Sequence, residues 1–120
     1  MSRILVVEDN PTNMKLAVML LETAGHAVIQ AENAADAIAQ ARAAPPDLIL
    51  MDIQLPDMDG LSATRLLKQD ETTAGIRIVA LTAWAMKGDE ERIRAAGCDG
   101  YIAKPIQYRE FLAEVRRMLE

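Results

Sequence analysis

The stretch ILVVEDNPTN, residues 4–13, joins an apolar run to an amphipathic stretch through two adjacent acids. The four aliphatic residues 4–7 end abruptly at Glu8 and Asp9. Asparagine followed by proline is typical of a helix N-cap and first helical position, so Asn10 and Pro11 predict the start of a helix. Neighbouring carboxylates repel each other, and their place at the end of a strand indicates that positive charge gathers there too.

The same succession of a short apolar run and an amphipathic stretch occurs five times. The runs are short and unbroken, which is typical of strands buried on both faces of a parallel sheet; they cover residues 4–7, 27–29, 48–51, 78–81 and 101–103. Apolar residues at helical spacing fill the intervening stretches, which cover residues 14–21, 34–43, 61–68, 89–96 and 108–115. Five strand–helix units predict an α/β fold with helices on both faces of a parallel sheet.

Length and composition exclude several classes of protein. A chain of 120 residues with no composition break predicts one domain, residues 1–120. The net charge of −5, without a basic cluster, argues against direct binding of nucleic acid. No apolar run approaches the roughly 18 residues of a membrane span. Cys98 is the only cysteine, which fits a reducing cytoplasm, and His26 is expected in a surface loop without a chemical role.

Polar side chains follow four of the five predicted strands. Glu8 and Asp9 come after the first, Asp52 after the third, Thr82 after the fourth and Lys104 after the fifth. Ligands of open α/β sheets bind outside the carboxyl ends of the strands, so we expect these residues to converge on one crevice. Carboxylate oxygens without a nearby His or Cys favour Mg²⁺. The crevice is thus predicted to be a Mg²⁺-assisted phosphoryl site with Asp52 as nucleophile, while Thr82 and Lys104 hold phosphoryl oxygens.

Each of these signals also has a purely structural interpretation. Acids just before a helix favour its positive end, and Glu8 and Asp9 need do nothing more. Asp52 and Thr82 could be loop or helix caps. Only their joint occurrence at successive strand ends makes the functional interpretation strong.

The segments VVEDN, MDIQLPDMDG, LTAWAMKGD and GCDGYIAKPI together resemble the receiver domain of bacterial two-component response regulators. The resemblance covers essentially the whole chain and is closest to single-domain CheY-like and DivK-like receivers. It implies the flavodoxin-like (βα)5 fold with strand order 2-1-3-4-5. The last predicted helix, which runs to the end of the sequence, is expected to complete this fold.

The resemblance assigns a role to each site residue. Asp52 would accept a phosphoryl group from a phosphohistidine on a sensor histidine kinase or a histidine phosphotransfer protein. Mg²⁺ would be bound by Asp9, Asp52 and the main-chain carbonyl of Gln54, with Glu8 assisting through water. The phosphoryl oxygens would be held by Lys104, which a cis bond to Pro105 positions, by Thr82 and by the amide of Ala83. Such a domain would catalyse its own phosphorylation and slow hydrolysis without turning over another substrate.

The resemblance also implies how a phosphorylated domain would signal. Tyr101 would be the switch aromatic that swings inward when Thr82 moves toward the phosphate. A downstream protein would bind the face formed by the fourth helix, fifth strand and fifth helix, or the first helix, where Leu16, Met19 and Leu20 flank the core stripe. Trp84 is a candidate shield of the acyl phosphate from water.

Three alternatives remain open at this point. A flavodoxin-type FMN binder would need a Ser-, Thr- or Gly-rich phosphate loop where this chain has two acids. A phosphatase of the haloacid dehalogenase kind would have a second acid two residues after its nucleophile, where this chain has Gln54. A pseudo-receiver would bind partners without phosphorylation, and it predicts a site with missing residues.

Overall fold

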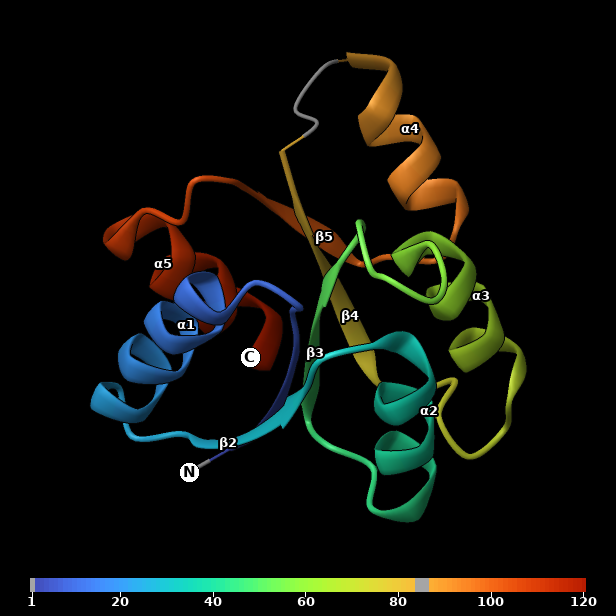
Figure 1. The fold of residues 1–120 in the computed structure, drawn as a ribbon, viewed down its shortest axis with the longest axis horizontal. Helices are drawn as coiled ribbons and strands as arrows, with labels where there is room; N and C mark the ends of the chain where they lie inside the picture. Colours follow the sequence, from blue (N-terminus) through green and yellow to red (C-terminus); the bar gives the residue numbers. More distant parts are fainter. Residues whose placement is uncertain (1, 84–86) are drawn as a thin grey trace.

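The computed structural model describes residues 2–83 and 87–120, which form five parallel strands and five helices (Figure 1). Strands and helices alternate along the whole chain: β1 (Arg3–Val7), α1 (Pro11–Thr23), β2 (Ala27–Ala31), α2 (Ala34–Ala43), β3 (Leu48–Asp52), α3 (Gly60–Gln69), β4 (Arg77–Thr82), α4 (Lys87–Ala95), β5 (Gly100–Ala103) and α5 (Tyr108–Leu119). None of the helices in this part of the chain is long and apolar enough to cross a membrane.

The strands form one sheet in the order β2-β1-β3-β4-β5, with every neighbouring pair parallel. This confirms the predicted flavodoxin-like architecture. β1 lies between β2 and β3, so the chain reverses its direction of winding there. The carboxyl ends of β1 and β3 therefore flank the topological switch point, where open α/β sheets place their ligand site.

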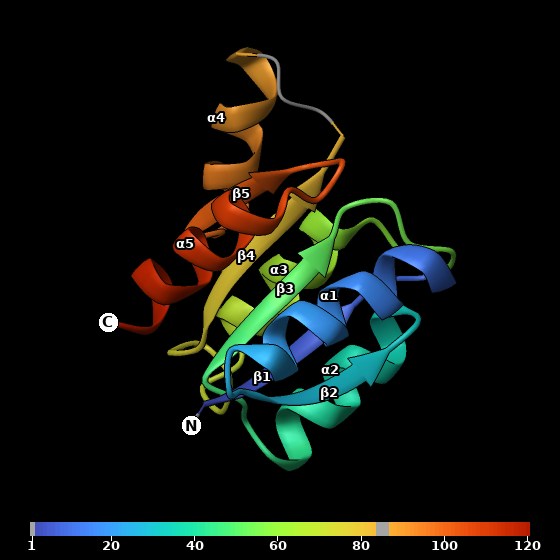
Figure 2. The same ribbon diagram turned by 90° about the vertical axis from the view of Figure 1, so that its left-hand side faces the viewer.

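Helices cover both faces of the sheet and bury it in two separate cores (Figures 1 and 2). α1 and α5 pack on one face, where Phe111 and Val115 contact the sheet. α2, α3 and α4 pack on the other, where Leu67 and Ile93 lie in the second core. Successive residues of β1 alternate between the cores, which explains why its sequence is continuously apolar.

The predicted start of the first helix at Asn10 and Pro11 is confirmed, and glycines follow two of the helices. The side chain of Asn10 accepts hydrogen bonds from the amides of Thr12 and Asn13 at the start of α1. Gly25 and Gly97 follow α1 and α4 with φ angles of 95° and 107°, a left-handed conformation that glycine adopts without a steric penalty.

The structure differs from the expected pattern in three places. β2 is an edge strand, and residues 27–29 are only partly buried because no strand covers their outer side. Tyr108 was expected in the apolar stripe of α5 but is 60% exposed, because it is the first residue of that helix, at the carboxyl edge of the sheet where the core ends. Asp52 and Thr82 are the last residues of β3 and β4 rather than residues beyond them.

Because Gly60 has no side chain, the backbone at the start of α3 contacts the backbone at the end of β3 directly. Its amide donates a hydrogen bond to the Ile53 carbonyl at 2.7 Å. A Cβ atom at this position would lie 2.1 Å from the carbonyl oxygen of Asp52 and 2.8 Å from the Cα of Ile53. Since both are backbone atoms, neither can rotate away.

We therefore expect Gly60→Ala to lower the free energy of unfolding by about 2–4 kcal/mol. Urea denaturation followed by circular dichroism measures this. Gly75→Ala is the matched control, because a Cβ there meets nothing within 4 Å, and its effect should stay within about 0.5 kcal/mol. Equal effects of the two substitutions would contradict the steric explanation.

Candidate functional site

Three acids meet at the switch point of the sheet. Glu8 and Asp9 directly follow β1, and Asp52 ends the neighbouring strand β3. One carboxylate oxygen from each of the three lies within 4.8 Å of the others. Glu8 and Asp52 are only 1% and 3% exposed, whereas Asp9 faces solvent. The convergence expected from the strand ends is therefore present.

Lys104 brings positive charge to the buried acids from the far edge of the sheet. Its Nζ lies 2.8 Å from Oε1 of Glu8 and 3.2 Å from Oδ1 of Asp52. The backbone amide of Lys104 donates to the carbonyl of Thr82 at 2.7 Å, which anchors the start of this side chain beside the end of β4. The peptide bond between Lys104 and Pro105 is cis.

Two backbone amides orient the buried carboxylates. The amide of Asn10 donates to Oε2 of Glu8, and the amide of Gln54 donates to Oδ1 of Asp52, each at 3.1 Å. Oε1 of Glu8 is fully buried and accepts no well-aligned hydrogen bond, although the Lys104 ammonium is close to it. A buried carboxylate oxygen with unused acceptor capacity is suited to a cation or to its bound water.

The charges of the site do not balance without a further cation. Burial, reinforced by the neighbouring Glu8 carboxylate, raises the pKa of Asp52 to about 7. Burial alone would raise the pKa of Glu8 as well, but the contacts with Asp52 and the Lys104 ammonium and the hydrogen bond from the Asn10 amide lower it below its usual value. Without a bound metal, Asp52 therefore carries a proton over much of the range below neutral pH.

The donor set fits Mg²⁺. In the described part of the chain, Glu8, Asp9 and Asp52 are the only acidic, His or Cys side chains grouped closely enough to hold a metal ion. All three offer oxygen, and one is open to solvent so that water can complete the coordination shell. Mg²⁺ prefers this combination of a few carboxylates and several waters.

The other predicted site residues lie on β4 and β5 or in the loops that follow β3 and β4. Thr82 is buried at the end of β4, the strand next to β3, and Ala83 follows it in an exposed position. Gln54 is two residues past Asp52 and exposed. Tyr101 is partly buried against the core under α4, and its hydroxyl lies 3.5 Å from Oε2 of Glu90 on that helix. Trp84 lies outside the described residues.

The surface of α1 only partly matches the expected docking strip. Leu20 is 7% exposed and belongs to the core, which corrects its assignment to the flank. Leu16 is partly buried, and Met19 is 55% exposed. Leu20 is buried because the sheet-facing side of α1 includes both Leu20 and Leu21 in its final turns.

Asp57 is a site neighbour that sequence patterns did not identify. It lies in the loop after β3, and its two carboxylate oxygens accept hydrogen bonds from the amides of Ala34 and Ala35, both at 2.9 Å. These hydrogen bonds hold its pKa below the usual value. The loop that carries Gln54 is thus fastened to the first turn of α2, a partner 22 or 23 residues away that no local pattern could reveal.

We expect Asp57→Ala to release this loop without unfolding the domain. The amides of Ala34 and Ala35 would lose their acceptors, so their hydrogen-exchange rates should rise about tenfold or more relative to the core of α2. Exchange followed by NMR provides the measurement. Asp47→Ala, which removes an exposed carboxylate at the opposite end of the sheet, should leave both rates unchanged.

Comparison with known proteins agrees with this arrangement. The response regulator receiver domain family matches residues 4–116. The polar-differentiation response regulator DivK of Brucella anthropi is 48% identical over 116 residues, which cover 97% of this chain and 94% of that protein.

Solved structures share the whole fold. The receiver domain of sensor histidine kinase PA1611 from Pseudomonas aeruginosa, which has a magnesium ion coordinated in its active site cleft, has a TM-score of 0.91 and 37% identity, and the match covers 98% of this chain and 97% of that one. The chemotaxis response regulator CheY4 of Vibrio cholerae has a TM-score of 0.94 and 25% identity over 99% of both chains. The chain belongs to the receiver domains of two-component response regulators, and among them it is DivK-like.

Proposed function

We propose that this receiver accepts a phosphoryl group on Asp52 from a phosphohistidine, in a Mg²⁺-dependent reaction, and thereby changes its affinity for partner proteins. The observation that carries the proposal is the group of three carboxylates with Lys104 reaching two of them. The donor would be a sensor histidine kinase or a histidine phosphotransfer protein. The whole chain, residues 1–120, would act as one phosphoacceptor domain.

The metal would be held by Asp9, Asp52 and the carbonyl of Gln54, with Glu8 assisting through water. When bound, it supplies positive charge that offsets the charge on the transferring phosphoryl group. The magnesium described in the PA1611 receiver supports this assignment. The site residues of this chain would then have three tasks: holding Asp52 in line, keeping it ionised and neutralising the phosphoryl oxygens.

Asp52 must lose its proton before it can act as a nucleophile. The Gln54 amide donates to Oδ1 of Asp52. The other carboxylate oxygen would approach the phosphorus atom. In the transfer, an oxygen–phosphorus bond forms at Asp52 while the phosphorus–nitrogen bond of the donor histidine breaks, and the imidazole leaves with the electron pair. Lys104, now 3.2 Å from Asp52, would pair with a phosphoryl oxygen.

The acyl phosphate would reorganise the residues at the end of β4 and β5. The hydroxyl of Thr82 and the amide of Ala83 would donate to its remaining oxygens. Movement of Thr82 would let Tyr101 swing inward, away from Glu90 on α4. A downstream protein would recognise the resulting change on the α4–β5–α5 face or on α1. Coupling of this kind is typically worth about 1–3 kcal/mol, enough to change an affinity severalfold or more.

Intact-mass spectrometry after incubation with acetyl phosphate tests the proposal. We expect a single phosphoryl adduct in the presence of Mg²⁺, none in the presence of a chelator, and none with Asp52→Asn. Asp59→Asn is the control, because Asp59 caps α3 in the same loop and its loss should leave the adduct in place. An unmodified wild-type protein under all conditions would indicate a receiver that acts without phosphorylation.

A further inference from the structure

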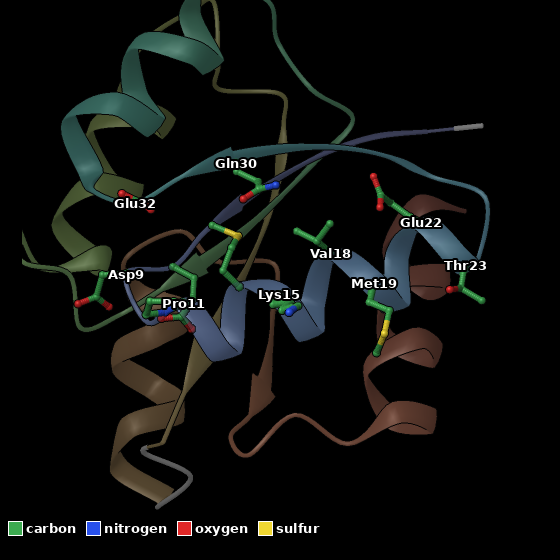
Figure 3. Close-up of a pocket in the computed structure, with 11 residues that line it drawn as sticks. Asp9, Pro11, Lys15, Val18, Met19, Glu22, Thr23, Gln30 and Glu32 are labelled. Carbon is green, nitrogen blue, oxygen red and sulfur yellow. The ribbon is translucent and has the colours of Figure 1, made fainter.

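A groove of about 510 Å³ runs between α1 and the edge strand β2, and one of its ends reaches the acids of the metal site (Figure 3). Met14, Val18 and Met19 supply an apolar wall at helical spacing along α1, and Gln30 lines the groove from β2. Met19 is 55% exposed. Methionine is flexible and polarisable, so such a surface can adapt to side chains of different shape.

The ends of the groove are acidic. Asp9 and Glu32 lie at one end and Glu22 lies toward the other, on either side of the apolar wall (Figure 3). Lys15 is the single basic residue of the lining. Across residues 2–83 and 87–120, no ion pair engages Asp9, Glu22 or Glu32. The lining thus carries more negative than positive charge, and Lys15 offsets only part of it.

The charge pattern selects among the occupants that such a groove could take. A second copy of the chain would bring the same acids to a self-complementary contact, and like charges would face each other. A partner segment with basic residues at both ends and apolar residues between them would match both features. α1 has 13 residues, so the groove beside it has room for a helix of about three to four turns.

We propose that the α1–β2 groove binds a basic amphipathic helix of a partner protein. Its apolar residues would lie mainly on Val18 and Met19, because Met14 is only 6% exposed. Its Lys or Arg residues would pair with Asp9 and Glu32 at one end and with Glu22 at the other. This binding needs neither phosphorylation of Asp52 nor Mg²⁺. It can therefore be tested in the presence of a chelator, where failure of the phosphoryl-transfer proposal has no influence on the result.

Fluorescence anisotropy with a synthetic peptide provides the first measurement. The probe is a labelled amphipathic peptide of about 14 residues, with Leu on one helical face and Lys elsewhere; a matched peptide carries Glu in place of Lys. We expect the Lys peptide to bind, its affinity to fall as salt is added, and the Glu peptide not to bind. Equal binding of the two peptides would overturn the proposal.

Charge-matched variants distinguish binding in the groove from attraction of the peptide by the net negative charge of the protein. Met19→Glu and Glu22→Lys should each weaken peptide binding about tenfold, and both positions are exposed enough to keep the fold. Leu66→Glu and Glu71→Lys are the controls: they make the same changes at exposed positions away from the groove, and each should change the affinity less than about twofold. An equal loss for Glu22→Lys and Glu71→Lys would show that net charge alone attracts the peptide. Unchanged or tighter binding by Met19→Glu would show that the apolar wall does not contact the peptide. Either result would overturn the proposal.

NMR locates the bound peptide. With ¹⁵N-labelled wild-type protein in chelator, amide shifts should be largest in α1 and β2. Shifts centred on α4, β5 and α5 would overturn the proposal. So would shifts of α1 and β2 that depend on protein concentration without peptide, because they would identify a second copy as the occupant.

Discussion

We expect the replacement of Asp52 by Asn to make the metal-free protein more stable at pH 8, by about 2–4 kcal/mol. The physical reason is the raised pKa of Asp52, which is about 7 in the folded chain compared with an ordinary value of 3.8. An asparagine amide can donate to Glu8 as the protonated acid does, and it brings no second charge into the buried site. Part of the gain is offset because Lys104 loses one of its two carboxylate partners.

The sign of the pH dependence follows from proton counts. Below about pH 4, Asp52 is protonated in both the folded and the unfolded chain. Between about pH 4 and pH 7, the folded chain holds a proton at this residue that the unfolded chain has lost, so stability falls as the pH rises. Above pH 7 Asp52 is ionised in the folded chain as well, and the full free-energy cost of burying its charge is present, on the order of 4 kcal/mol. The advantage of Asp52→Asn should therefore shrink by about 2–3 kcal/mol between pH 8 and pH 5.

Urea denaturation in chelator at the two pH values gives these free energies. Glu71→Gln, a neutral substitution at an exposed loop acid, should change stability by less than about 0.5 kcal/mol at both. Mg²⁺ at pH 8 should stabilise the wild type much more than Asp52→Asn, since binding requires the carboxylate. Two results would contradict the explanation that a buried charge on Asp52 destabilises the fold. One is an Asp52→Asn variant less stable than the wild type at pH 8, and the other is a stability difference that does not change with pH.

Removing Lys104 should destabilise the metal-free protein at pH 8 by about 3–5 kcal/mol. Lys104→Ala leaves Glu8 and Asp52 buried beside each other without the ammonium that contacts both. The pKa of Lys104 itself is raised: burial would lower it, but the contacts with Glu8 and Asp52 outweigh that effect. Much of the lost stability should return when Mg²⁺ is added, because the ion supplies the missing positive charge.

Arg42→Ala is the control for this experiment. Arg42 forms an ion pair with Asp70 at 2.7 Å, but its side chain is 53% exposed, so its loss should change stability by less than about 1 kcal/mol, with or without Mg²⁺. The measurement is again urea denaturation, now as a function of Mg²⁺ concentration. A destabilised Lys104→Ala that Mg²⁺ does not rescue would show that the lysine acts through packing and not through charge.

The succession of strands and helices could be predicted because its signals are local. Each signal depends on residues only a few positions apart. This holds for the apolar runs, for the Asn10 cap and for the glycines after α1 and α4. The strand order came from the resemblance of the motifs to receivers. Predictions of burial were wrong where burial depends on a neighbouring element. Tyr108 is exposed and Leu20 is in the core, because the position of the sheet determines which side of a helix is buried.

For the site, the sequence by itself determined which chemical groups are available and that they follow strand ends. Only the tertiary structure decided which of them touch: that Lys104 reaches both Glu8 and Asp52, that Asp57 fastens its loop to α2, and that α1 and β2 enclose an acid-rimmed groove. The physical reason is the difference in sequence separation between the interacting groups. Caps and turns depend on atoms a few residues apart, whereas burial, ion pairing and the pKa of Asp52 depend on groups that only folding brings within a few ångströms of one another.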